Sequence, residues 1–174
     1  MNFSKLVLAM GMGVVLVSGA ANAANGGQGV VNFKGSIVDA PCSISGDSTE
    51  QTVDLGAVSS ASLENSGTST PRTFNINLQD CALSTQKTVT TTFTGTASKA
   101  NPDNLGIMGK AAGASILITD GAGTPIKLGT ASSAQKLSDG NNTLRFTASL
   151  QGDGSSSITA GDFTSVADFM LSYQ

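Results

Sequence analysis

Apolar and polar residues alternate in short segments along the chain, and turn residues separate these segments. The alternation is clearest at 73–80 and 143–150, where apolar residues occupy every second position. A period of two places these side chains on one face of a β-strand. Further strands are predicted at 30–38, 52–56, 87–95, 115–119 and 125–128. We expect the last of these at a sheet edge, because Pro125 cannot donate a hydrogen bond to a neighbouring strand.

The C-terminal segment 161–174 has the same period, with four apolar residues on one parity: Ala167, Phe169, Leu171 and Tyr173. Apolar residues of helical period do not extend over ten positions anywhere in the sequence. The remaining predictions are turns at 101–104, 120–121 and 139–142, one helical turn at 58–63 and a flexible tip at 152–157. Short strands with frequent turns favour an all-β antiparallel sandwich.

The first 23 residues predict a cleaved secretory signal. Lys5 gives a short positive region, Leu6–Val17 is apolar, and Ala21–Ala23 forms a small-x-small site for cleavage after Ala23. The alternative is an N-terminal membrane anchor, but this apolar run falls short of the roughly 20 residues that a spanning helix needs. The remaining chain, 24–174, has a suitable length for one domain.

Cys42 and Cys81 are the only cysteines. An even pair in an exported chain predicts a structural disulfide, here between the ends of two strands. Closing a loop of this length stabilises a fold by roughly 4 kcal/mol in the chain-entropy model. The alternatives are a redox pair, although there is no CxxC sequence, or half of a metal site, although there is no histidine to complete it.

The composition argues against catalysis, metal binding and nucleic-acid binding. Without histidine, Ser-His-Asp and Cys-His arrangements are impossible. Most acidic residues fall in predicted turns, where solvated carboxylates are the simplest interpretation, and no glycine-rich segment matches a phosphate-binding loop. A net charge of −3 gives no reason to expect DNA or RNA as a partner. We therefore expect no catalytic residues, no metal and no cofactor.

Three blocks of sequence resemble the pilins of chaperone–usher fimbriae, especially the major rod subunits of type 1 and P fimbriae. The first is 31–44, which leads through Ala40-Pro41 into the first cysteine. The second is Asp54-Leu55-Gly56 with 59–63, followed by 74–81 up to the second cysteine. The third is the C-terminus, with a penultimate Tyr173 and with Gly161 fourteenth from the end. The resemblance extends over the whole chain, signal included.

The resemblance implies an incomplete immunoglobulin-like antiparallel sandwich that is completed by donor-strand exchange. Residues 24–34 would form the donor extension and residues 35–174 the pilin domain. The donor positions facing a neighbour's groove would be Gly27, Gly29, Val31 and Phe33. The acceptor groove, which contacts the chaperone or the next subunit, would involve Gly161, Phe163, Ala167, Phe169, Leu171, Tyr173 and Gln174.

The partners implied are identical or related pilin subunits in a homopolymer, a periplasmic chaperone and an outer-membrane usher. The Gln174 carboxylate would be the anchor that basic residues of the chaperone hold. The chain would be exported through the periplasm to a fimbrium on the cell surface and would support cell adhesion as a structural subunit, with the major rod pilin as the favoured role.

Other interpretations stay open at the level of the sequence. One alternative is a minor or adapter subunit, and another is a complete monomeric periplasmic β-sandwich that binds a ligand. A two-domain adhesin would need about twice this length. The alternative for Val31 and Phe33 is that they belong only to the subunit's own first strand, and the alternative for the C-terminal alternation is an ordinary buried strand.

Overall fold

The computed structural model describes residues 29–154 and 157–174. The chain divides into two units, Met1–Ile37 and Val38–Gln174. The predicted signal, 1–23, and the predicted donor position Gly27 lie outside the described residues. The first unit is therefore represented by 29–37, which the structure shows as chain without helix or strand. The second unit contains every helix and strand described below.

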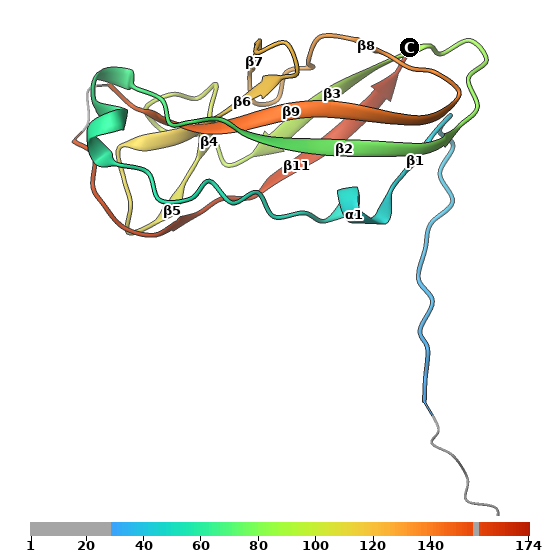
Figure 1. Cartoon of the computed structure of the whole chain (residues 1–174), viewed down its shortest axis with the longest axis horizontal. Helices are drawn as coiled ribbons and strands as arrows, with labels where there is room; N and C mark the ends of the chain where they lie inside the picture. The colour runs from blue at the N-terminus through green and yellow to red at the C-terminus, as the bar shows by residue number, and fades with distance from the viewer. Residues whose placement is uncertain (1–28, 155–156) are drawn as a thin grey trace, which may run out of the picture. The chain divides into compact units, whose positions relative to one another are not determined.

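Strands dominate the second unit, and its helices are short (Figure 1). The helices are α1 (Gly46–Thr49) and the 3-10 helix η1 (Ser60–Ser66). The strands are β1 (Ser43–Ile44), β2 (Arg72–Cys81), β3 (Thr88–Gly95), β4 (Leu105–Gly106), β5 (Met108–Gly109), β6 (Ala114–Asp120), β7 (Pro125–Ile126), β8 (Gln135–Lys136), β9 (Gly140–Gly152), β10 (Phe163–Thr164) and β11 (Ala167–Tyr173).

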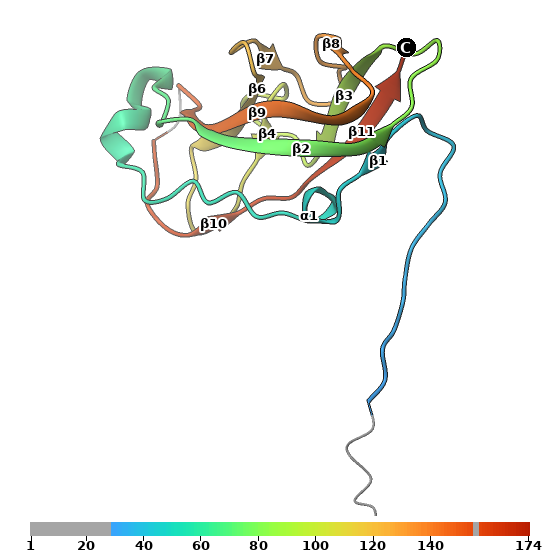
Figure 2. The same ribbon diagram turned by 45° about the vertical axis from the view of Figure 1, so that its right-hand side comes forward.

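The strands form one large antiparallel sheet and two smaller ones. The large sheet has the order β1-β2-β9-β6-β4, with β7 pairing to β6. The second sheet has the order β11-β3-β8, and the third pairs β10 with β5. Turning the ribbon shows β3 and β11 behind the long strands β2 and β9 (Figure 2). The predicted all-β antiparallel sandwich is confirmed.

Side chains from both sheets meet in an apolar core. β2 contributes Ile76 and Leu78, and β9 contributes Leu144 and Phe146, all almost completely buried. Phe93 of β3 crosses the gap between the sheets, with its ring centre 5.1 Å from that of Phe146 and nearly perpendicular to it. Edge-to-face contacts of this kind add to the stabilisation from burial itself. The alternation predicted at 73–80 and 143–150 thus identifies the core-facing residues correctly.

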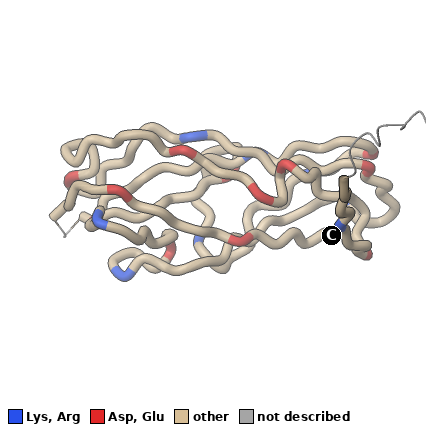
Figure 3. Tube along the Cα trace, turned by 90° about the horizontal axis from the view of Figure 1, so that it is seen from below, with Lys and Arg blue, Asp and Glu red and all other residues tan. Residues whose placement is uncertain are grey.

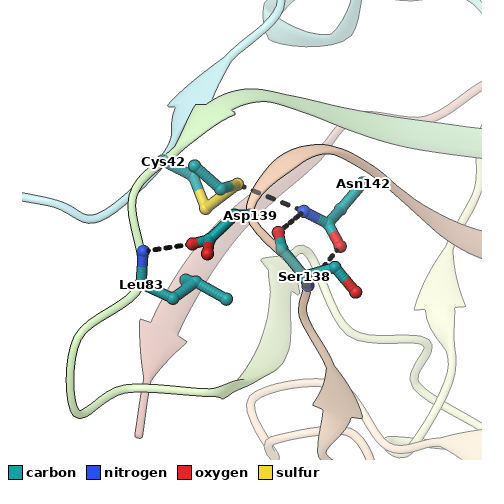
Figure 4. The surroundings of a disulfide bond; sticks show 6 residues. Cys42, Leu83, Ser138, Asp139 and Asn142 are labelled. Carbon is teal, nitrogen blue, oxygen red and sulfur yellow. Dashed lines mark hydrogen bonds between the residues drawn. A yellow bond between two sulfur atoms is a disulfide. The ribbon is translucent and has the colours of Figure 1, made fainter.

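The predicted disulfide between Cys42 and Cys81 is present. It joins the residue before β1 to the last residue of β2, where the neighbouring turn supports it (Figure 4). The Asn142 side chain donates a 2.7 Å hydrogen bond to the Ser138 carbonyl, and its Nδ2 lies 3.3 Å from the Cys81 sulfur. Asp139 accepts a 2.8 Å bond from the Leu83 amide. These contacts fix the start of β9 against the disulfide.

Two predicted strands are not strands. Residues 30–38 have no backbone partner within the described residues, and all are exposed. Residues 52–56 also lack a ladder, although Val53 and Leu55 are half-buried while Thr52 and Asp54 are exposed. Apolar and polar residues alternate in 52–56, and Val31, Phe33 and Ile37 share one parity in 30–38. A strand also needs a neighbouring backbone for its hydrogen bonds, and none of the described strands pairs with either segment.

Smaller differences concern the ends of elements. The edge strand predicted at 125–128 is limited to β7, which pairs only with β6. The turn predicted at 139–142 is shorter, because β9 begins at Gly140. The helical turn predicted at 58–63 forms slightly later, as η1. The predicted tip at 152–157 includes residues 155–156, which lie outside the described residues.

Candidate functional site

One edge of the sandwich has no neighbouring strand among the described residues. β11 pairs with β3 along its whole length, from Ala167 opposite Gly95 to Tyr173 opposite Val89, and with no other strand. β10 pairs only with β5. The other edges of β10 and β11 therefore present backbone N–H and C=O groups that no strand satisfies. Such an edge is a template for the addition of a further strand.

The segment 51–58 lies across from this edge and forms the second wall of a gap. It is attached to β2 by a 3.2 Å hydrogen bond from the Gln51 side chain to the Asn75 carbonyl. A hydrogen bond from the Gly56 amide to the Asp54 carboxylate turns the chain at its end. The alternating half-burial of Val53 and Leu55 is explained by this position, because their side chains face the gap.

The gap is a continuous apolar groove. Two cavities, of about 690 and 660 Å³, lie end to end and share the lining residues Thr52, Val53, Leu55, Ile116 and Ser165. The floor of the first cavity includes Leu63, Ala114, Ile116 and Leu150, and that of the second includes Phe74, Phe93, Ile118 and Ala148. Since most of these are core residues, the sandwich is open to its core along this side.

Four of the predicted acceptor residues line this groove. Gly161 and Phe163 border the first cavity, and Ala167 and Phe169 border the second. Leu171 and Tyr173 do not border either cavity, but they are half-buried and pack against the core further along β11. The groove, defined here by its wall from Gly161 to Phe169, thus follows β10 and the first half of β11.

Gly161 has a position that only glycine fits. Its φ is +156°, and a Cβ there would lie 2.7 Å from Lys110 Cβ and 2.9 Å from the Ala111 nitrogen. Both distances are shorter than real Cβ contacts. The Asp162 carbonyl next to it accepts hydrogen bonds from the amides of Lys110 and Ala111. The close approach of these two backbones therefore holds the start of β10, and with it the wall of the groove.

The C-terminal residues are fixed at the far end of β11 (Figure 1). A main-chain oxygen of Gln174 accepts hydrogen bonds from the amides of Lys87, at 2.7 Å, and Thr88, at 2.9 Å. The Gln174 amide donates to the Thr88 carbonyl. Partial burial raises the pKa of the neighbouring Tyr173 hydroxyl above its ordinary value, because the phenolate would lose solvation.

The predicted donor positions Gly29, Val31 and Phe33 lie in the exposed segment 29–37 of the first unit. Phe33 is 91% exposed and Val31 is also largely exposed. An aromatic side chain left this open to water is unusual, because burying it would stabilise the protein by roughly 1.5–3 kcal/mol. We call residues 29–37 the donor arm.

The sequence did not identify the second wall or the floor of the groove. The family resemblance pointed to the C-terminal strand alone, and 52–56 was interpreted as a strand of the sandwich. The sequence did contain a signal, since Val53 and Leu55 are the apolar residues of this segment and lie two positions apart. The contributions of Ile107 and Ile158 could not be found in this way, because they lie in irregular segments with no period to follow.

Charged and metal-binding side chains offer no rival site in the described ranges. Acidic and basic residues are scattered over the trace rather than gathered in one patch (Figure 3). Within 29–154 and 157–174 there is no group of three or more His, Cys, Asp or Glu side chains suited to hold a metal ion. None of the helices in these ranges is long and apolar enough to cross a membrane.

An open apolar groove beside a C-terminal strand with one free edge is the arrangement expected for a pilin domain. The family model described as "Fimbrial protein" matches residues 31–174. The chain therefore belongs to the fimbrial protein family.

Relatives of this chain are similar over nearly their whole length. The Fimbria A protein of Serratia marcescens is 62% identical, with 91% of each chain covered. The Major MR/P fimbria protein of Proteus mirabilis is 51% identical, with each chain fully covered. Among solved structures, the P pilus rod subunit PapA matches with a TM-score of 0.69 and 34% identity, covering 78% of this chain and all of that one. A subunit from a chaperone–usher pilus structure matches with a TM-score of 0.77, again at 34% identity, covering 85% of this chain and 96% of that one.

Proposed function

We propose that this protein is the major structural subunit of a chaperone–usher fimbria and polymerises by donor-strand exchange. The observation that carries the proposal is that one chain contains both an open apolar groove and an exposed apolar arm. The arm of one subunit would fill the groove of the next, adding a strand to the unpaired edge of β10 and β11. Repetition of this step gives a filament.

The donor positions fit within the length of the groove wall. The groove wall from Gly161 to Phe169 is nine residues long, about 27 Å at the rise of a strand. The inward positions of the donor extend from Gly27 to Phe33, which is about 20 Å in an extended chain. Val31 and Phe33 would supply the apolar burial, and Gly27 and Gly29 would sit where the groove is shallow.

A subunit with an empty groove would be prone to aggregate before assembly. It exposes core side chains together with an unpaired strand edge, a combination that favours aggregation. A periplasmic chaperone is therefore the expected first occupant, and an outer-membrane usher the expected place of exchange. We assign the anchor for the chaperone to the Gln174 carboxylate, at the end of β11. The assembled fimbrium lies on the cell surface.

The major-subunit assignment is supported by the Proteus mirabilis relative, whose name describes a major fimbria protein, and by the likeness to a P pilus rod subunit. The role is structural, because strand addition needs shape and apolar surface rather than a reactive group. We expect no catalytic activity and no cofactor.

The test is to delete residues 24–34 in the chromosomal copy and to shear surface filaments from the cells. For the intact protein we expect one dominant band in the sheared fraction, as a major subunit requires. The deletion variant should be absent from that fraction. If filaments of normal length still contain the deletion variant, the arm is not the donor. If the intact protein is only a trace component of the filaments, it is a minor subunit.

A further inference from the structure

The charged side chains that line the groove are all of one sign. Asp54 and Asp162 border the first cavity, and Glu50 and Asp168 border the second. Among the described residues, no lysine or arginine lines either cavity. All four acidic residues are exposed, so their side chains belong to the mouth of the groove rather than to its apolar floor. We call these four residues the acidic rim.

The acidic rim occupies both sides of the groove. Asp162 directly precedes β10 and Asp168 belongs to β11, on the side of the unpaired strand edge. Asp54 belongs to the opposite wall, 51–58, and Glu50 directly precedes that wall. A strand that enters the groove would therefore have carboxylates on both sides, at each of the two cavities.

Two basic residues lie near the walls without lining the groove. The Lys110 amide donates to the Asp162 carbonyl, and Arg72 borders a separate polar pocket that Asp54 also lines. Within 29–154 and 157–174, the single ion pair of the structure does not involve the acidic rim. The negative charge of the rim is therefore not held in ion pairs of its own subunit and can attract an approaching arm.

The N-terminal segment that would supply the donor carries the opposite charge. Between residues 24 and 38, Lys34 is the only charged residue, and it is exposed. Lys34 directly follows Phe33, so in an extended strand the two side chains point to opposite faces. When Phe33 enters a groove, the Lys34 side chain therefore points out of it, towards the acidic rim.

The spacing of the rim makes this meeting independent of the exact register. Asp162 and Asp168 are six positions apart on one wall, about 20 Å in a strand. Wherever Phe33 lies along the wall from Gly161 to Phe169, Lys34 is at most about 10 Å along that wall from one of these two carboxylates. This distance is about the screening length at 0.1 M salt, so the charges can attract each other before the strand is fully seated.

We propose that Lys34 steers the donor arm: the acidic rim of one subunit attracts Lys34 of the next and raises the rate at which the arm enters the groove. This inference rests on the proposed function. Exposed charge pairs add little to the strength of a finished contact, but charges at a rim speed the encounter. The apolar residues of the arm hold the assembled filament, and Lys34 acts on how fast it forms.

The test is the salt dependence of assembly by full mature subunits purified with their periplasmic chaperone. Lys34→Gln is compared with Lys136→Gln, which removes the same charge from β8, a strand that lines neither cavity. Raising the NaCl concentration from about 10 mM to about 1 M shortens the screening length from about 30 Å to about 3 Å. At the lower concentration, Lys34→Gln should assemble roughly threefold more slowly than Lys136→Gln, or slower still. At the higher concentration, the two rates should agree within about 1.5-fold.

Lys34→Arg keeps the charge and should assemble at the wild-type rate at both salt concentrations. Equal rates for Lys34→Gln and Lys136→Gln at low salt would overturn the steering role. A slower rate for Lys34→Gln that persists unchanged at high salt would also overturn it, because a packing contact would then be responsible.

The variant Phe33→Asp separates this failure from a failure of the proposed function. If Phe33→Asp does not assemble at either salt concentration while Lys34→Gln and Lys136→Gln assemble equally fast, strand exchange stands and only the steering role is wrong. If Phe33→Asp assembles normally, strand exchange itself is wrong and the steering role falls with it.

Discussion

Single residues determine whether the wall of the groove can form. The sequence singles out Gly161 and Tyr173 only because their distances from the C-terminus match those in the resembled family. It offers no physical reason for either residue. The structure supplies one for Gly161, because the backbone of 110–111 leaves no room for a side chain. No pattern in the sequence could have shown this, since the two segments are about fifty residues apart and meet only in the fold.

Gly161→Ala should therefore destabilise the domain itself. The added Cβ forces β10 away from Lys110, and the φ of +156° is strained for alanine, so we expect a loss of about 1–3 kcal/mol in the free energy of unfolding. Chemical denaturation of a subunit carrying its own donor strand measures this. Gly46→Ala is the control, because nothing lies within 4 Å of its Cβ position. Equal stability of both variants would show that the wall tolerates a side chain at 161.

Tyr173 should make stability depend on pH in the alkaline range. Burial raises the folded-state pKa above 10.0, so the folded protein holds the hydroxyl proton more tightly than the unfolded chain. The resulting stability is fully present below pH 10 and is lost as the pH rises through the folded-state pKa.

The measurement compares melting temperatures at pH 9 and pH 11. Tyr173→Phe removes only the hydroxyl group, so the fall between the two values should be larger in the wild type. An identical fall in both proteins would mean that Tyr173 is as well solvated in the fold as in the unfolded chain.

At the scale of elements, alternation predicted which side chains face inward better than it predicted strands. It was right for β2 and β9, whose partners lie in the same sheet. It was wrong for 30–38 and 52–56, which alternate but have no ladder. A period of two reports which face of an extended chain is buried. It does not report whether the partner backbone belongs to the same chain.

Alternate residues of the donor arm are predicted to face into and away from the neighbour's groove, and this can be tested. Val31→Asp places a charge in the neighbour's apolar groove, which is strongly unfavourable, whereas Val30→Asp points the charge outward. Both valines are highly exposed in the single chain, 73% and 87%, so neither change should affect the fold of the subunit. We expect Val31→Asp to reduce filament yield at least tenfold and Val30→Asp to reduce it little. Electron microscopy and shearing measure the yield, and equal loss in both variants would contradict the assigned parity.

At the scale of the whole molecule, the sequence was sufficient for the fold class, the disulfide and the family. These follow from local patterns, from an even pair of cysteines in an exported chain, and from motifs in a fixed order. The groove could be expected only through the resemblance. Its geometry depends on how β10, β11 and 51–58 meet around a missing strand, and residues far apart in the chain decide that.

The central claim is that the domain lacks one strand, which the N-terminal segment of the same sequence can supply. The measurement that tests it most directly is the thermal unfolding of two variants. One lacks residues 24–34, and the other carries that segment after Gln174 through a flexible linker. We predict that the first is prone to aggregate, and that the second is a monomer with a much higher melting temperature. Two equally stable monomers would mean that the sandwich is already complete, and this would contradict the account.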